Sequence, residues 1–166
     1  MKKSSNARMI TMGAAIAALY VVFTLIANAF GLANYAIQVR FSEALTILPY
    51  FTTVAVPGLY VGCVISNILT GAMPLDIVFG SLATLIGAIG TRYLAVKLPE
   101  KKWLAPIPPI VANTIIVPII LAYVYKFEGS IPYFMVTVGI GEVISCGLLG
   151  MGLMHTLLKY KDRIFE

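Results

Sequence analysis

Charged side chains are scarce in this sequence. Among 166 residues there are seven acids and twelve bases, whereas hydrophobic residues make up 60% of the chain. Soluble domains contain about 45–50% apolar residues, so a soluble domain of this length could not hide so much apolar surface. The mean hydropathy of +0.93 points the same way. The scarcity of charge therefore excludes an ordinary soluble domain and predicts an integral membrane protein.

Residues that commonly carry chemistry are also few. The chain has two cysteines and one histidine, a composition that offers no pattern of a disulfide framework or a zinc site. Cys63 and Cys146 lie in apolar segments, where a free cysteine packs as a small hydrophobe. Gly139 and Gly141 are not followed by the third glycine of a dinucleotide-binding turn, and no P-loop occurs. These observations predict no enzyme activity, no cofactor, no metal and no ATP hydrolysis by this chain.

The net charge of +5 does not indicate a nucleic-acid partner, because the bases flank apolar segments instead of forming a basic face. If the N-terminus is inside, only Arg40 and Lys126 lie outside. The other ten bases are then cytoplasmic or close to it: Lys2, Lys3, Arg8, Arg92, Lys97, Lys101, Lys102, Lys159, Lys161 and Arg163. By the positive-inside rule, this asymmetry predicts a multi-pass protein of the cytoplasmic membrane with both termini in the cytoplasm.

Long runs with at most one charge supply the candidate spans. They cover residues 9–39, 44–75, 77–91, 103–125 and 129–158. A spanning helix needs about 20 apolar residues, and a bilayer favours helices because they satisfy their own backbone polar groups. We therefore expect an all-α bundle of six transmembrane helices, forming one substrate-binding domain over residues 1–166. The expected helices are at about 8–29, 42–54, 57–70, 76–97, 104–125 and 132–159.

Ionisable side chains inside a membrane are costly and mark candidate functional sites. Glu142 lies about ten residues into the last expected helix, which at 1.5 Å per residue is roughly 15 Å deep and near the midplane. Glu43 and Asp76 fall at the outer ends of their helices, and Arg40 precedes the first of these acids. These four residues could converge on one cavity that opens to the outside.

Each of these residues also has a purely structural interpretation. Glu142 could be a protonated acid bonded to a neighbouring helix, and Arg40 could pair with Glu43. Ser42 and Asp76 could cap helix N-termini, where polar and acidic side chains are favoured.

Amides and small residues leave similar alternatives open. Asn67 and Asn113 could contact a ligand or join neighbouring helices by hydrogen bonds. Ala14 and Ala18 are spaced so that another helix can approach closely. A comparable stripe in the fourth expected helix favours internal packing, and it contains Gly80, Ala83, Thr84, Gly87 and Ala88.

Three stretches resemble the signature of the QueT family: IQVRFSEALTILP at 37–49, VPGLYVGC at 56–63 and LDIVFGSLATL at 75–85. Members of this family are substrate-binding S-components of energy-coupling factor (ECF) transporters. The resemblance implies capture of a queuosine precursor, a 7-deazaguanine base, from outside. It also implies three partners, namely a membrane coupling protein and two cytoplasmic ATPases. Ala14 and Ala18 match the family's Ala-x-x-x-Ala contact for the coupling protein, and the loop at 30–41 matches the segment that closes over the ligand.

The candidate residues suit such a base. It presents adjacent N–H donors and one carbonyl, and an aminomethyl substituent adds a cation. One carboxylate could accept the two N–H groups, another could hold the ammonium, and Arg40, Gln38 or an asparagine could donate to the carbonyl. Phe41, Tyr50 or Tyr133 could stack on the ring. The expected ligand-binding residues are Gln38, Arg40, Glu43, Asn67, Asp76, Asn113 and Glu142.

Two other classes of protein remain compatible with the sequence. One is a stand-alone carrier of a small cationic or purine-like solute, driven by an ion gradient, with Glu142 as its proton site. The other is an assembly subunit without a ligand. Carriers usually show internal repeats and broken helices, and no clear repeat occurs here, whereas a scaffold has little need for Glu142. The aminomethyl base, its nitrile precursor and queuine are all candidate ligands.

Overall fold

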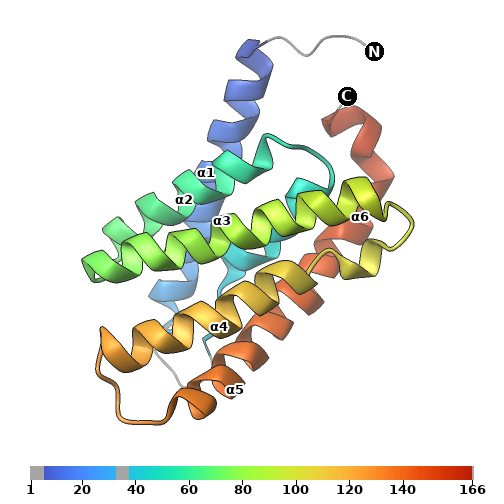
Figure 1. Ribbon diagram of the computed structural model, residues 1–166. Helices are drawn as coiled ribbons and strands as arrows, with labels where there is room; N and C mark the ends of the chain where they lie inside the picture. Colours follow the sequence, from blue (N-terminus) through green and yellow to red (C-terminus); the bar gives the residue numbers. More distant parts are fainter. Residues whose placement is uncertain (1–5, 33–37, 166) are drawn as a thin grey trace.

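The computed structural model describes residues 6–32 and 38–165, and over these residues the chain is helical without strands (Figure 1). The α-helices are α1 (Asn6–Ala29), α2 (Ala55–Leu69), α3 (Pro74–Lys97), α4 (Ile107–Tyr123), α5 (Ile131–Glu142) and α6 (Gly150–Ile164). Two 3-10 segments, η1 (Phe41–Tyr50) and η2 (Lys102–Leu104), and one π-helical segment, η3 (Val143–Leu149), complete the architecture.

Within the described residues, four helical stretches are long and apolar enough to cross a membrane: Asn6–Ala29, Pro74–Lys97, Lys102–Tyr123 and Ile131–Lys161. The last of these is continuous through α5, η3 and α6. The protein is therefore a multi-pass membrane protein, and four of the expected spans are confirmed. α2 is apolar but has only 15 residues, which is about 23 Å at 1.5 Å per residue and less than the roughly 30 Å of a bilayer core.

The prediction of a second span at 42–54 is wrong. Phe41–Tyr50 forms a 3-10 helix of ten residues, and every residue from Ser42 to Pro49 is buried. At about 2.0 Å per residue this segment covers only roughly 20 Å. It is enclosed by α1, α3, α6 and η3, with which it makes most of its contacts. Its apolar composition reflects burial inside the protein, since lipid and protein interior favour the same side chains.

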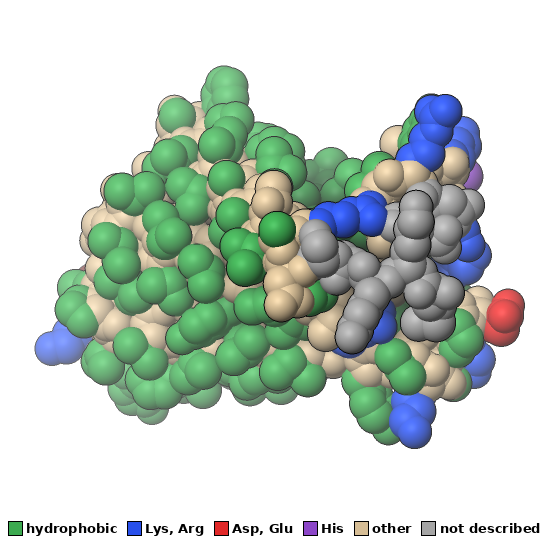
Figure 2. All heavy atoms as spheres, turned by 90° about the horizontal axis from the view of Figure 1, so that it is seen from above, with side chains coloured by type: hydrophobic (Ala, Val, Ile, Leu, Met, Phe, Trp, Pro, Cys, Tyr) green, Lys and Arg blue, Asp and Glu red, His purple; other side chains and the backbone are tan. Residues whose placement is uncertain are grey.

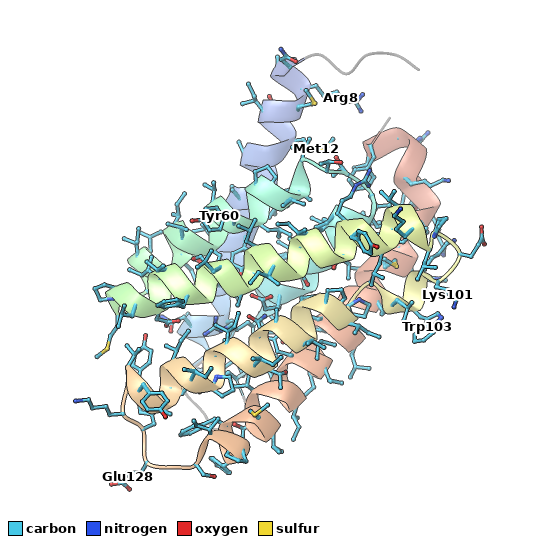
Figure 3. The ribbon with its side chains drawn as sticks, viewed as in Figure 1. Arg8, Met12, Tyr60, Lys101, Trp103 and Glu128 are labelled. Carbon is cyan, nitrogen blue, oxygen red and sulfur yellow. The ribbon has the colours of Figure 1, made fainter. Side chains whose placement is uncertain are left out.

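The two ends of the bundle differ in charge. The start of α1 and the end of α6 lie together (Figure 1), and Arg8 Nη2 donates to the Ile164 carbonyl oxygen at 3.5 Å. Glu128, in the α4–α5 loop, lies at the opposite end (Figure 3). Figure 2 shows a hydrophobic body with most of the visible basic side chains toward one end. This distribution suits a body surrounded by lipid with charged ends in water.

Glycines allow the central helices to approach closely. A Cβ added at Gly62 would lie 2.9 Å from the Ala17 carbonyl oxygen, and one added at Gly87 would lie 2.6 Å from Pro109 Cα. The α1–α2 and α3–α4 pairs are accordingly the most extensively packed. The small residues of the fourth expected helix are all buried in α3. The internal-packing interpretation of that stripe is therefore confirmed.

We expect Gly87→Leu to lower the stability of the protein, because the larger side chain would have to displace the backbone of Pro109. Overpacking of a core typically costs about 1–3 kcal/mol of stability. For a chain of this size, each kcal/mol lowers the thermal midpoint of unfolding by about 2–4 °C. The buried thiols of Cys63 and Cys146 can report unfolding in detergent through a thiol-reactive dye. Gly152→Leu is the control, because a Cβ at Gly152 meets nothing within 4 Å. Equal midpoints for the two variants would contradict the expectation.

Candidate substrate-binding site

A cavity of about 660 Å³ opens among the end of α1, the start of α3 and the α4–α5 region. Its polar lining includes Thr24, Asn28, Gln38, Arg40, Asn67, Thr70, Asp76 and Glu128. Among the described residues, four aromatic side chains complete the wall: Tyr125, Phe127, Tyr133 and Phe134. The volume lies within the range of small-molecule sites, about 300–1,000 Å³. Its mixture of aromatic surface and a few polar groups is typical of a site for a flat polar molecule.

Gln38, Arg40, Asn67 and Asp76 were expected to bind ligand, and all four line this cavity. The Arg40 guanidinium donates through Nη2 to Gln38 Oε1 at 3.4 Å. The backbone N–H of Arg40 donates to Ser145 Oγ at 3.1 Å, which ties the segment before η1 to η3. This contact holds Arg40 at the cavity wall.

The other three expected residues form a separate buried cluster beside the cavity. Glu43 is 1% exposed, Asn113 4% and Glu142 6%. Asn113 Nδ2 donates to Glu43 Oε2 at 3.4 Å, and the Tyr20 hydroxyl donates to Glu43 Oε1. These bonds bring η1, α4 and α1 together around one carboxyl group. The cluster does not line the open cavity.

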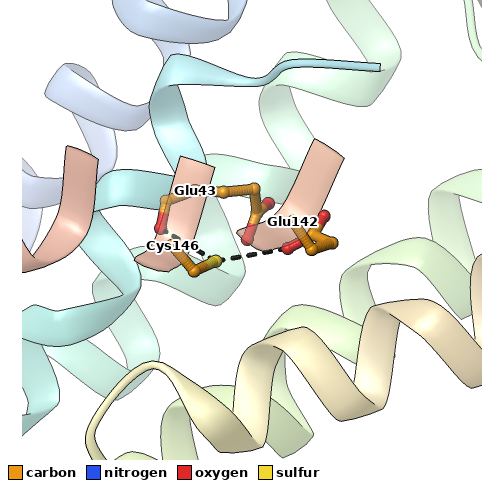
Figure 4. A group of neighbouring side chains, drawn as sticks. All are labelled: Glu43, Glu142 and Cys146. Atoms are coloured by element: carbon orange, nitrogen blue, oxygen red, sulfur yellow. Dashed lines mark hydrogen bonds between the residues drawn. The ribbon is translucent and has the colours of Figure 1, made fainter. Parts of the chain in front are cut away.

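Cys146 links the two buried acids (Figure 4). Its Sγ donates to Glu142 Oε2 at 3.2 Å and lies 3.5 Å from the Glu43 carbonyl oxygen. The Thr46 hydroxyl donates to the same carbonyl oxygen at 2.6 Å. One ligand atom from each of Glu43, Glu142 and Cys146 lies within 4.8 Å of the others. That spacing would suit a small cation, but the thiol is used here as a hydrogen-bond donor. The arrangement is therefore a hydrogen-bonding network rich in acceptors.

The ion-pair and helix-cap interpretations of these polar residues are wrong. Among the described residues no ion pair joins Arg40 to Glu43, whose partners are Tyr20 and Asn113. Asp76 is not an N-cap, because Met73 holds that position in α3. Arg40 holds the N-cap position of η1, and Ser42 Oγ is buried without a hydrogen-bond partner in the part of the chain that the structure describes.

The prediction that four charged residues converge on one open cavity is also wrong. Arg40 and Asp76 line the cavity, whereas Glu43 and Glu142 meet in the neighbouring buried cluster. Glu43 lies in the first turn of η1, at a helix start as expected, but this segment is buried and its carboxyl group is therefore enclosed by protein.

Asp76 has a partner that the sequence did not indicate. The Tyr125 hydroxyl donates to Asp76 Oδ2 at 2.8 Å and accepts from the Met73 N–H at 3.2 Å. Tyr125 lies just after α4, a position typical of an ordinary membrane-interface aromatic residue. Cys146 was missed as well, although its position one turn after Glu142 was a usable signal. Tyr20 had no signal, since its contact joins residues 23 apart.

The expected aromatic stacking residues are separated in the structure. Tyr133 lines the cavity, but Phe41 does not. The prediction that Tyr50 contacts the ligand is wrong, because its hydroxyl donates to the Pro99 carbonyl oxygen at 2.6 Å in the α3–α4 connection. The aromatic wall instead comes from the α4–α5 connection and the first turn of α5.

Comparison with known proteins decides the class. A family model described as QueT transporter matches residues 10–159. The chain belongs to the QueT transporter family. It is also 35% identical over 86 residues to the queuosine precursor transporter QueT of Lactococcus lactis subsp. cremoris (strain MG1363), and the match covers 52% of this chain and 50% of that protein. No solved structure matches the chain.

Family membership confirms the resemblance seen in the sequence and classifies the protein as a transporter, not an enzyme. The matched region includes all of the cavity-lining residues and the whole buried cluster. The site described above therefore lies within the part of the chain that defines the family.

Proposed function

We propose that this protein captures a queuosine precursor, a 7-deazaguanine base, from outside the cell as the S-component of an ECF transporter. The observation that carries the proposal is a polar and aromatic cavity, beside a buried pair of acids, in a member of the QueT transporter family. The name of the Lactococcus relative supports the substrate class. Import is then driven by a membrane coupling protein and two ATPase subunits.

The cavity chemistry supports a purine-like ligand. Aromatic side chains can stack on the faces of a flat base. Arg40, Gln38 and Asn67 supply donors for the ring carbonyl, and Asp76 supplies an acceptor for a cationic substituent. Adenine presents an acceptor where guanine presents a donor, so it would leave buried polar groups unpaired and bind weakly.

The buried cluster gives the second half of the proposed site. Two carboxyl groups lie close together there, and they accept hydrogen bonds from neutral tyrosine, asparagine and cysteine donors. Such groups are costly inside a membrane unless they are paired. The adjacent N–H donors of a guanine-type edge would pair with them. We assign the pairing edge to Glu43, Asn113 and Glu142.

The surface of α1 supports the proposed partner. Ala14 and Ala18 are exposed, whereas Ala17 between them is buried against α2. Small exposed side chains at this spacing allow a second membrane helix to approach closely. The coupling protein would dock on this face from within the bilayer. The proposal also keeps both termini in the cytoplasm, on the side of the ATPases.

The decisive experiment is a binding measurement on the purified chain in detergent without ATP. We expect saturable binding of 7-aminomethyl-7-deazaguanine, measured by titration calorimetry, and much weaker binding of adenine. Queuine and 7-cyano-7-deazaguanine complete the set of ligands. A chain that stays folded but binds none of the three deazaguanines would refute the proposed substrate.

A second measurement separates an S-component from a stand-alone carrier. Vesicles containing this chain alone should not accumulate the base when a proton gradient is imposed. Vesicles that also contain the coupling protein and the ATPases should accumulate it when ATP is supplied. Accumulation driven by the gradient alone would favour the carrier.

A further inference from the structure

Asp76 accepts a hydrogen bond on one side and is open on the other. Its Oδ2 accepts from the Tyr125 hydroxyl at 2.8 Å. Its Oδ1 lies against α3 beside Gly80, since a Cβ added at Gly80 would be only 2.8 Å from this oxygen. No protein donor is bonded to Oδ1 among the described residues, and Asp76 lines the cavity. A ligand therefore has one carboxyl oxygen available to it.

The hydroxyl of Tyr125 holds this arrangement in one orientation. A phenol has a single proton to donate, and here the oxygen also accepts from the Met73 N–H at 3.2 Å. The accepted bond leaves the proton directed at Asp76. The ring is held in turn by Phe127, with centroids 5.6 Å apart. Tyr125 thus connects the start of α3 to the end of α4 and fixes the direction of the carboxyl group.

The surroundings of Asp76 favour a cation. The part of the chain that the structure describes contributes four aromatic side chains to the cavity wall, including Tyr125 itself, and aromatic faces attract ammonium groups. Glu128 adds a second acid to the wall, and Arg40 is the one basic side chain that residues 6–32 and 38–165 contribute to the lining. The paired acids Glu43 and Glu142 come from other elements, η1 and α5. The molecule therefore offers two separate groups of acceptors.

We propose that Asp76, oriented by Tyr125, forms a subsite for the primary ammonium of the ligand, and that Tyr125 is the residue that sets the preference for an amine-bearing base. This inference rests on the proposed function and divides that site in two. The ring edge is bound by Glu43, Asn113 and Glu142. The substituent is bound at Asp76, so Tyr125 acts as a positioning residue.

The test is the ratio of affinities for the aminomethyl and nitrile bases. Tyr125→Phe keeps the ring and removes the hydrogen bond, and it should weaken binding of the aminomethyl base by about tenfold or more. Its affinity for the nitrile base should stay at the level of the parent. Asp76→Asn should show the same selectivity with a larger loss. A merely structural role for Tyr125 would lower both affinities together.

The matched control is Tyr123→Phe, since Tyr123 is 69% exposed and lies outside the cavity. Its affinity ratio should equal that of the parent. Thermal midpoints of all variants, followed through the buried cysteines, identify any that are unfolded. Equal losses for both bases in Tyr125→Phe, or no loss for either, would overturn the subsite. If the folded parent binds neither base, the proposed function fails and the subsite fails with it.

Discussion

Glu142→Gln should bind its 7-deazaguanine base roughly 10-fold to 150-fold more weakly than the parent. A hydrogen bond between a charged and a neutral group contributes about 1.5–3 kcal/mol, and each 1.4 kcal/mol is about tenfold in affinity. Glu142 is 6% exposed, and it accepts a hydrogen bond from the neutral thiol of Cys146. The substitution preserves the shape of the side chain but replaces one acceptor oxygen with a donor.

The role of Glu142 can be distinguished from that of Asp76 by which bases lose affinity when each acid is replaced. An acid that binds the ring edge should lose affinity for the aminomethyl and nitrile bases equally. Glu43→Gln should behave in the same way, because its carboxyl group lies beside that of Glu142. Glu100→Gln is the matched control, since Glu100 is exposed in the α3–α4 connection. Variants of both buried acids that fold and bind both bases normally would show that the cluster only packs helices.

Replacing Ala14 and Ala18 together by Trp should abolish ATP-driven uptake while leaving capture of the base nearly normal. Both alanines are exposed on α1, and neither lines the cavity between α1, α3 and α4. Two indoles on this face would prevent the close approach of a second helix. The variant should therefore bind ligand in detergent but fail to co-purify with the coupling protein.

The control for this prediction keeps the same number of indoles on the same helix. Leu19 and Ile26 are also exposed on α1, but at about 100° per residue they lie well to one side of the alanine face. Trp at these two positions should leave assembly and uptake intact. If the alanine variant assembles normally but loses ligand binding, the stripe supports the substrate site and not the partner.

The sequence by itself determined the class of protein and much of its architecture. Runs with few charges predicted six spans, because the cost of placing charge in a bilayer is large and local. Four of the six are helices of membrane length in the structure. The signature stretches around Arg40, Pro57 and Asp76 were sufficient to indicate the family. The burial of the stripe in α3 also followed from its spacing, since four-residue periodicity places small side chains on one helix face.

The tertiary structure alone decided which polar residues meet. Hydropathy measures how readily a side chain leaves water. A lipid-facing span and a segment enclosed by protein therefore have the same hydropathy. For this reason Phe41–Tyr50 could not be recognised from the sequence as a buried 3-10 helix. The bond from Asn113 to Glu43 joins residues 70 apart, and the bond from Tyr125 to Asp76 joins residues 49 apart. Such contacts depend on how helices pack against each other, which no local pattern records. The division between an open cavity and a buried acid pair is therefore a product of the packing.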